Sequence, residues 1–403
     1  MTVKIKPSIL SGEVKAPPSK SMAHRLLICA GLSDGYSVIK NIAYSEDVLA
    51  TIDCLEAIGA SVTRGADFIR IKGASPLKSK GGRYFCRESG STLRFFLPLA
   101  MLSECESIFS GSERLMERPM SVYKKIAEQR GLFYEKSSDG LLRVRGKLKA
   151  GTYKVSADIS SQFISGLLFA LPLCDGDSEI ILEGKIESRS YIDLTLEAMK
   201  MFGVSASWRD DSLYIRGGQS YKCTELNVEG DYSNAAFFEA FNLVGGDVTV
   251  KGLREDTGQG DKVYKSLFSL LKDGKPTLDI SNCPDLAPIL MALAAELNGA
   301  VLEGTARLRI KESDRGLVMK RELSKFGAEI ELSDNKIVIN KSGLSAPSEL
   351  LYSHNDHRVV MSLAVLCSKY GGEIKGAEAV KKSYPDFFVH TAKLGMEAII
   401  NDD

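Results

Sequence analysis

A short polar motif followed by an apolar run occurs six times along the chain. The first example spans residues 17–33 and reads Pro-Pro-Ser-Lys-Ser-Met-Ala-His-Arg-Leu-Leu-Ile-Cys-Ala-Gly-Leu-Ser. Ser19 or Ser21 can cap a helix here, and the residues that follow are too apolar to face water. The other five motifs begin at Glu88, Asp158, Gly230, Cys283 and Asn355. The pattern predicts six buried helices, and six such helices indicate six structural repeats.

A recurring glycine supports this interpretation. Gly59, Gly131 and Gly203 each close an amphipathic segment and precede a hairpin pattern, and successive members lie 72 residues apart. A βαβαββ-like unit repeated three times over about residues 14–227 accounts for the spacing. Gly327, which precedes an apolar strand pattern at residues 336–340, has the same role in the second half of the chain.

The fourth repeat lacks its closing hairpin. Its pattern predicts a buried helix at residues 233–244, a strand at 247–252 and a helix at 262–271. Only residues 277–280 then separate that helix from the next polar motif. A strand is therefore missing from the second half, and the N-terminal residues 3–8 can supply it.

This assignment makes one domain discontinuous, because the chain starts in one domain, builds the other as an insertion and then returns. Crossovers are expected near residues 11–16 and 227–230. We expect a discontinuous domain of residues 1–13 plus 229–403 and an inserted domain of residues 14–228, with the active site in the cleft between them. The last repeat is expected to end after a helix at residues 385–398.

Composition limits the function classes. The 403 residues are 44% hydrophobic and 26% charged, which suits two globular domains. Lys plus Arg and Asp plus Glu both number 52, so no overall field favours nucleic acid or an anionic membrane. Eight cysteines without Cys-x-x-Cys spacing argue against a disulfide framework. With no signal-type or membrane-spanning run, we expect a cytoplasmic protein with no nucleic-acid or membrane partner.

The polar motifs are unusually rich in cations. A helix N-terminus needs only Ser, Thr, Asp or Asn as a cap, and it already carries roughly half a positive charge. Several such ends with added Lys and Arg would bind an anion. The side chains that suggest this are Lys20, Ser21, Arg25, Arg94, Ser160, Ser161, Gln162, Asp285 and Arg358. Further charged strings cover residues 114–119, 307–315 and 381–386, and the second alternates as a strand would, with Arg307, Arg309 and Lys311 on one face.

Simpler interpretations exist for several of these residues. A single Lys or Arg is commonly a solvated surface charge, and Asp285 can be a first-turn carboxylate favoured by the helix dipole. Arg94 and Arg309 are assigned as structural ion-pair partners. His354 and His357 form His-x-x-His, but without a third ligand no metal is expected.

In these motifs the chain resembles the 5-enolpyruvylshikimate-3-phosphate synthase family over almost its full length. The shared motifs, in family order, are Pro18-Ser-Lys-Ser21 with Arg25, Gly90-Ser-Thr-Leu-Arg94, Glu117-Arg-Pro119, Ser160-Ser-Gln162, Ser188-Arg-Ser-Tyr191, Lys311-Glu-Ser-Asp-Arg315, Asn355-Asp-His-Arg358 and Lys382-Ser-Tyr-Pro-Asp386. The resemblance implies an α/β (α+β) fold: a two-domain inverse α/β barrel of six βαβαββ repeats, three per domain, with buried parallel helices.

The resemblance also implies a reaction. The enolpyruvyl group of phosphoenolpyruvate moves to the 5-hydroxyl of shikimate 3-phosphate, in the shikimate pathway, with release of phosphate and without a metal or organic cofactor. The residues implied for shikimate 3-phosphate are Lys20, Ser21, Arg25, Ser160, Ser161, Gln162, Ser188, Asp285 and Lys311. Those implied for phosphoenolpyruvate are Lys20, Gly90, Arg118, Gln162, Arg315, Arg358 and Lys382.

Three residues are implied in proton transfer. Asp285 is the candidate base for the 5-hydroxyl, Glu312 is the candidate acid at the methylene carbon, and Lys20 is a competing acid or base near the oxygen. A carboxylate that faces a dianionic ligand is expected to have a raised pKa. Family habit implies a monomer.

The chain departs from the family pattern in places, and two other functions compete. Pro18 replaces a glycine, Glu88 and Ser89 replace Asn-Ala, Phe95 replaces a proline and Arg307 replaces an asparagine, so the response to glyphosate is not predicted. UDP-N-acetylglucosamine enolpyruvyltransferase has the same fold and donor but uses a loop cysteine, and residues 112–121 contain none. A non-catalytic protein that captures phosphorylated metabolites would gain nothing from Asp285 and Glu312.

Overall fold

The computed structural model describes residues 1–156 and 159–401, and its contacts divide the chain into two compact units. Unit 1 combines Met1–Ser19 with the chain from Gly230 onward, and unit 2 is Lys20–Glu229. The first boundary lies later than the expected residues 13/14. The reason is that β2 (Ser11–Lys15) pairs in parallel with β17 (Asp247–Lys251), with Val14 opposite Val250, so this segment belongs to unit 1.

Two repeats of unit 2 are complete, and both have the same strand order. One consists of β7 (Gly82–Phe85), α3 (Gly90–Ala100), β8 (Ser107–Ser110), α5 (Ser121–Arg130), β9 (Phe133–Lys136) and β10 (Leu142–Arg145). The other consists of β11 (Thr152–Ser156), α6 (Ser161–Ala170), β12 (Ser178–Glu183), α7 (Arg189–Met201), β13 (Ala206–Arg209) and β14 (Ser212–Ile215). In each sheet the first two strands are parallel, and the last strand in sequence lies between the second and third.

The remaining repeat of unit 2 is closed by a strand from far along the chain. Its sheet has the order β16-β4-β6-β5, and its elements are α1 (Lys20–Leu32), β4 (Tyr36–Lys40), α2 (Glu46–Ile58), β5 (Ser61–Arg64), β6 (Phe68–Lys72) and β16 (Glu225–Asn227). Because β16 pairs in parallel with β4, the last strand of the unit occupies the first position of this sheet. The short pair β3 (Ser33–Asp34) and β15 (Tyr221–Lys222) joins the same ends of the unit.

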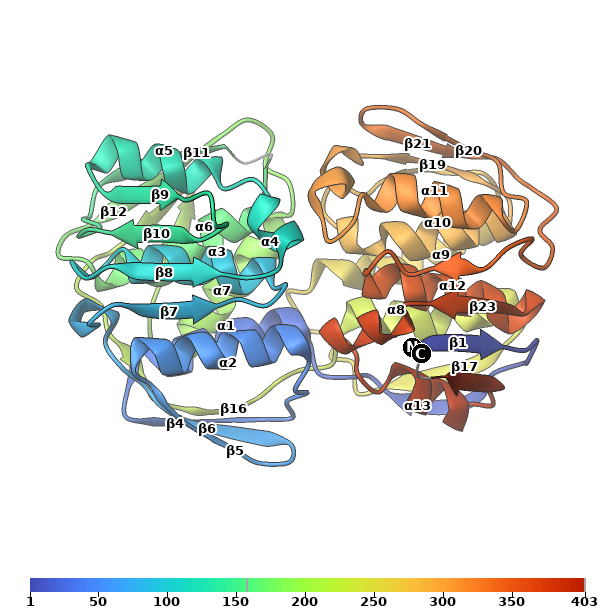
Figure 1. The fold of residues 1–403 in the computed structure, drawn as a ribbon, viewed down its shortest axis with the longest axis horizontal. Helices are drawn as coiled ribbons and strands as arrows, with labels where there is room; N and C mark the ends of the chain where they lie inside the picture. The colour runs from blue at the N-terminus through green and yellow to red at the C-terminus, as the bar shows by residue number, and fades with distance from the viewer. Residues whose placement is uncertain (157–158, 402–403) are drawn as a thin grey trace. The chain divides into compact units, whose positions relative to one another are not determined.

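The apolar runs form the core of unit 2. Residues 22–32 of α1 are all buried, and Figure 1 shows α3 and α6 behind the sheet that contains β8 and β10. Gly31 allows this packing, because a Cβ there would lie 2.3 Å from Leu55 of α2. Gly59 and Gly131 end α2 and α5 with φ of 109° and 64°, the left-handed conformation that favours glycine at a helix C-terminus.

Unit 1 follows the same plan with one shortened repeat. The complete repeat consists of β18 (Thr277–Asp279), α10 (Ala287–Glu296), β19 (Ala300–Glu303), α11 (Arg315–Ser324), β20 (Ile330–Leu332) and β21 (Lys336–Ile339). The shortened one contains only β2, α8 (Tyr232–Ala240), β17 and α9 (Tyr264–Asp273), and its sheet has two strands. The sequence predicted that this repeat lacks a hairpin after residue 271, and the two-stranded sheet confirms the prediction.

The N-terminal strand completes the last repeat of unit 1. Its elements are β22 (Leu351–Tyr352), α12 (His357–Tyr370), β23 (Gly372–Lys375), α13 (Phe387–Lys393) and β24 (Ala398–Asn401). The strand β1 (Thr2–Ile5) lies between β23 and β24 and is antiparallel to both. Figure 1 shows β1 beside β23. The prediction of a helix over residues 385–398 as the last element is therefore wrong, because residues 398–401 pair with β1 as a strand.

One short helix replaces a strand that the sequence predicted. The short helices of the described residues are η1 (Pro76–Lys78), α4 (Glu113–Glu117), η2 (Leu171–Leu173), η3 (Phe241–Val244), η4 (Gly260–Val263), η5 (Pro284–Leu286), η6 (Ala306–Ile310) and η7 (Ala377–Lys382). The predicted strand at residues 307–311 is instead the 3₁₀ helix η6, in which Leu308 packs into the core. Arg307 is consequently buried while Arg309 is exposed, so the two side chains do not share a face.

Candidate functional site

Arg315 is the centre of the charged cluster in unit 1. It begins α11, is 1% exposed and is surrounded by three carboxylates. Its Nη1 donates to Asp285 Oδ1 at 2.7 Å, its Nη2 to Glu312 Oε2 at 2.9 Å and its Nε to Asp356 Oδ2 at 2.9 Å. All three guanidinium nitrogens are thus engaged, and a charged donor makes each bond stronger than a neutral one.

Asp285 meets two more cations in the same cluster. Lys311 Nζ lies 3.3 Å from Asp285 Oδ1, and Arg358 Nη2 lies 3.2 Å from Oδ2. Burial raises the pKa of the Asp285 carboxyl, but the charges of Arg358, Lys311 and Arg315 outweigh burial and hold the pKa well below its ordinary value. The raised pKa expected of a carboxylate that faces a dianionic ligand stays a prediction, and in this cluster the cations lower the pKa of Asp285.

Arg358 connects this cluster to a carboxylate that the sequence did not single out. Its Nη1 donates to Ser233 Oγ at 2.6 Å and to the Asp285 carbonyl at 3.1 Å. Asp261, in η4, is buried in the same region, and burial together with the charge of Asp285 raises the pKa of Asp261 to about 6. A Gln-Gly-Asp sequence before an amphipathic helix was the only available signal.

The other predicted residues of unit 1 lie on adjoining segments. Lys382 is buried in η7 and donates to the Asn355 carbonyl at 2.5 Å, one residue before Asp356, the N-cap of α12. Arg307 donates to the Ser281 carbonyl at 2.7 Å. The structure therefore brings together Asp285, Lys311, Glu312, Arg315 and Arg358 by direct contact.

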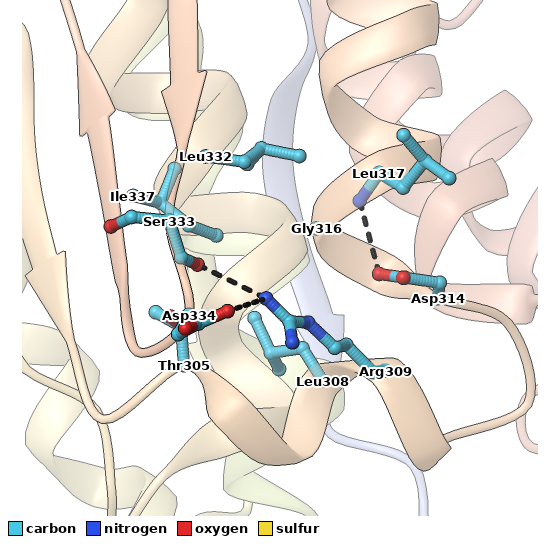
Figure 2. A pocket seen from close by; sticks show the side chains of 10 residues that line it. All are labelled: Thr305, Leu308, Arg309, Asp314, Gly316, Leu317, Leu332, Ser333, Asp334 and Ile337. Carbon is cyan, nitrogen blue, oxygen red and sulfur yellow. Dashed lines mark hydrogen bonds and ion pairs between the residues drawn. The ribbon is translucent and has the colours of Figure 1, made fainter.

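Arg309 is an ion-pair partner, as predicted. It lies beside a small pocket of about 40 Å³ at the start of α11, where it pairs with the exposed Asp334 at 3.1 Å (Figure 2). Asp314 at the same pocket caps α11 by accepting from the Leu317 amide at 3.1 Å. The pocket lining contains none of the predicted substrate residues.

In unit 2 the first helix carries three predicted residues. Lys20 pairs with Asp47 of α2 at 2.9 Å. Arg25 is buried and donates to Thr195 Oγ1, to the Tyr191 carbonyl and to the carbonyl of Ser21, at 2.9, 2.9 and 2.6 Å. Burial lowers the pKa of Arg25 to about 10, which leaves the guanidinium charged at neutral pH.

Gln162 is held in one orientation at the start of α6. Its Oε1 accepts from Arg94 Nη1 at 2.6 Å, and its Nε2 donates to Ser91 Oγ at 2.8 Å. Arg94, predicted as an ion-pair partner, also donates to the Pro119 carbonyl at 3.4 Å. Ser160 caps α6 by accepting from the Gln162 amide, and Ser161 is its first residue. The predicted motif begins at Asp158, which lies outside the described residues.

The remaining predicted residues also stand at helix ends. Ser188 is the N-cap position of α7, with a left-handed φ of 56°. Gly90 is the first residue of α3, and Arg118 directly follows α4. A Cβ at Gly90 would lie 2.5 Å from Arg118 Nη1 and 3.1 Å from Arg94 Nη1. The small residue at position 90 therefore makes room for the Arg118 guanidinium.

Replacement of Gly90 by alanine is expected to displace Arg118, because the added Cβ cannot coexist with Nη1 at 2.5 Å. If Arg118 holds phosphoenolpyruvate, the KM for that substrate should rise about tenfold, the loss of roughly one charged hydrogen bond. Steady-state kinetics checks this. Gly343→Ala is the matched control, since a Cβ there meets nothing within 4 Å. Equal KM values for the Gly90→Ala variant and the unmodified chain would contradict the prediction.

Comparison with solved structures identifies the fold. A structure titled EPSP synthase from Acinetobacter baumannii matches with a TM-score of 0.81 at 21% identity, covering 100% of both chains. A second Acinetobacter baumannii EPSP synthase structure matches with a TM-score of 0.80 at 20% identity, again over 100% of both chains. The chain thus has the two-domain α/β fold of these enzymes.

Sequence comparison identifies the family. The family model described as EPSP synthase (3-phosphoshikimate 1-carboxyvinyltransferase) matches residues 5–390. A 3-phosphoshikimate 1-carboxyvinyltransferase of Clostridium kluyveri is 43% identical over 98% of this chain and 97% of its own length. One of Clostridium perfringens strain 13 is 41% identical over 98% of each chain. The chain belongs to the EPSP synthase family.

No helix in the described ranges, residues 1–156 and 159–401, has both the length and the apolar character needed to cross a membrane.

Proposed function

We propose that this chain transfers the enolpyruvyl group of phosphoenolpyruvate to the 5-hydroxyl of shikimate 3-phosphate and releases phosphate, in the shikimate pathway to aromatic amino acids. The observation that carries the proposal is the family match over residues 5–390. The predicted cations support it, because both substrates are polyanions and the overall charge of the chain is balanced.

The residues proposed to bind the substrates are found in both units. In unit 2, the helix starts carrying Lys20, Ser21, Arg25, Gly90, Ser160, Ser161, Gln162 and Ser188 would bind the two substrates together with Arg118. In unit 1, Lys311, Arg315, Arg358 and Lys382 would provide the remaining cations. Planar guanidinium groups suit the carboxylate of phosphoenolpyruvate, because they can donate two parallel hydrogen bonds.

Substrate binding would convert Asp285 into a base. The low pKa of Asp285 depends on Arg358, Lys311 and Arg315. A phosphate or carboxylate group that draws these cations toward itself removes their stabilisation of the Asp285 carboxylate. The pKa of Asp285 then rises, as a base for the 5-hydroxyl requires.

Two carboxylates and one lysine are the candidates for proton transfer. Arg315 places Glu312 and Asp285 on two nitrogens of one guanidinium, 2.9 and 2.7 Å away. Glu312 would protonate the methylene carbon of phosphoenolpyruvate while Asp285 takes the hydroxyl proton. Lys20, paired with Asp47, is the alternative acid or base near the substrate oxygen. The sequence supplies residues for both proton transfers without a metal ion.

A phosphate-release assay tests the proposal. The chain is incubated with phosphoenolpyruvate and either shikimate 3-phosphate or UDP-N-acetylglucosamine. We expect phosphate to be released with shikimate 3-phosphate as the acceptor but not with UDP-N-acetylglucosamine. The reason is that residues 112–121 lack the loop cysteine used by the UDP-N-acetylglucosamine enzymes. Release with UDP-N-acetylglucosamine alone, or with neither acceptor, would refute the proposed function.

A further inference from the structure

A buried hydrogen-bonded network joins three helices of unit 2. His24 of α1 lies with Nδ1 2.7 Å from Thr51 Oγ1 of α2, and Thr51 Oγ1 lies 2.8 Å from Thr92 Oγ1 of α3. Thr92 Oγ1 in turn donates to Oγ of Ser89, the N-cap of α3, at 2.8 Å. The side chains of this four-residue network are at most 1% exposed.

The hydroxyl protons set a direction along the four-residue network. Thr92 has one hydroxyl proton and donates it to Ser89, so Thr51 must donate to Thr92. The proton between His24 and Thr51 then comes from Nδ1 of the imidazole. Burial, followed by the charges of Lys20 and Arg25, lowers the pKa of His24 well below its ordinary value, which keeps the ring neutral.

The network continues a contact made by a predicted substrate residue. Lys20 of α1 pairs with Asp47 of α2 at 2.9 Å, and His24 meets Thr51 at 2.7 Å. Each pair is separated from the other by four residues on both helices, which is one helical turn. The two contacts fix how α1 and α2 are aligned along each other. Thr51 also connects α2, through Thr92, to Ser89 at the start of α3.

Ser89 directly precedes Gly90, and the space at Gly90 accommodates Arg118. Thr51 therefore connects α1, the helix that begins with Lys20, to the start of α3, where Gly90 lies. The family resemblance assigns Gly90 to phosphoenolpyruvate alone and Lys20 to both substrates, so the larger effect is expected on phosphoenolpyruvate. No residue of the four-residue network is itself among the substrate residues.

A second buried threonine, Thr195, contacts the next residue of α1, Arg25. Thr195 of α7 accepts from Arg25 Nε at 2.9 Å and lies 2.8 Å from Ser165 Oγ of α6. The family resemblance assigns Arg25 to shikimate 3-phosphate. Thr195 and Thr51 are both fully buried. Thr195 thus has the same relation to a residue assigned to shikimate 3-phosphate as Thr51 has to the segment assigned to phosphoenolpyruvate.

We propose that Thr51 is a positioning residue for phosphoenolpyruvate, acting through Thr92 and Ser89 on α3 and through the α1–α2 register on Lys20. The proposal rests on the proposed function. Thr51 touches no substrate, and its hydroxyl acts by fixing the distance between two groups that do. A valine at this position keeps the shape of the side chain and removes the hydroxyl.

Steady-state kinetics of Thr51→Val tests this inference. The KM for phosphoenolpyruvate is expected to rise about fivefold, the effect of roughly one buried hydrogen bond, while the KM for shikimate 3-phosphate changes less than about twofold. Thr51→Ser keeps the hydroxyl and is expected to restore the KM for phosphoenolpyruvate. Thr195→Val is the matched variant and is expected to show the opposite split.

The possible outcomes separate the inference from the function. No phosphate release by the unmodified chain refutes the proposed function, whereas an active chain without the KM split refutes only the inference. A parallel rise in both KM values, or a Thr51→Ser variant that behaves like Thr51→Val, also refutes the inference. If Thr51→Val does not fold, Thr92→Val interrupts the same network, and an unchanged KM for phosphoenolpyruvate in that variant overturns the inference.

Discussion

Replacement of Asp285 by asparagine is expected to lower kcat by at least about a hundredfold, the usual contribution of a general base. The asparagine keeps the shape, and its side-chain oxygen can still accept from Arg315, which binds Asp285 Oδ1 at 2.7 Å. The backbone carbonyl at this position still accepts from Arg358 at 3.1 Å. The KM values are therefore expected to change by less than about threefold, because the loss falls on the transition state. Initial rates of phosphate release at several concentrations of each substrate provide the measurement.

The control for Asp285→Asn is Asp334→Asn. Asp334 is also an aspartate that pairs with an arginine of unit 1, but it is exposed and lies beside the small pocket rather than in the charged cluster. It should leave kcat unchanged. Full turnover in Asp285→Asn would remove this carboxylate from the mechanism.

Replacement of Arg315 by methionine is expected to lower the free energy of unfolding at pH 7 by about 3–5 kcal/mol, the cost of removing one partner from a buried charge cluster. Asp285, Glu312 and Asp356 all lose a hydrogen bond. Arg315 is 1% exposed and Asp356 is fully buried, so water cannot take over as it would at the surface. Urea unfolding, followed by circular dichroism, measures the difference.

The loss in Arg315→Met is expected to depend on pH. The cations hold the folded-state pKa of Asp285 below its ordinary value, so Asp285 contributes stability that is fully present above the unfolded pKa, near 3.9, and is lost as pH falls through the lower folded pKa. Without Arg315 this contribution is smaller at neutral pH. The difference in unfolding free energy between the two proteins should therefore narrow as the pH falls below about 4.

Arg309→Met is the control for the stability prediction. Arg309 also pairs with an aspartate, at 3.1 Å, but both partners are exposed. An exposed pair contributes less than about 1 kcal/mol, so this variant should remain close to the unmodified chain. Equal losses in the two variants, or a loss in Arg315→Met that does not change with pH, would show that the buried cluster has no special role.

Local patterns predicted several elements correctly, because they depend on neighbouring residues only. The apolar run of α1 is buried over residues 22–32. Gly59 and Gly131 end helices with positive φ, as a closing glycine should. The pattern failed at residues 307–311, where alternating charges suggested a strand. There the burial of Leu308 in the core, which involves residues distant in sequence, favours the 3₁₀ helix η6.

The candidate site was predictable by residue type but not by partner. The motifs indicated Asp285, Glu312 and Arg315 as chemically important, and the structure brings these three together. The direction in which the pKa of Asp285 is shifted could not be inferred from the sequence. It depends on Lys311, Arg315 and Arg358, which only the fold places around Asp285. The same holds for Asp261 and Thr51, which have ordinary sequence surroundings and acquire their partners through packing.

The sequence by itself determined the repeated pattern of capped apolar helices and the family motifs, because each is encoded over a few consecutive residues. Tertiary structure decided which distant strands complete each sheet, as when β16 pairs with β4 and β1 lies between β23 and β24. It also decided which charges face one another around Arg315. Strand pairing and buried electrostatics depend on distances between residues far apart in the chain, and only the folded molecule sets those distances.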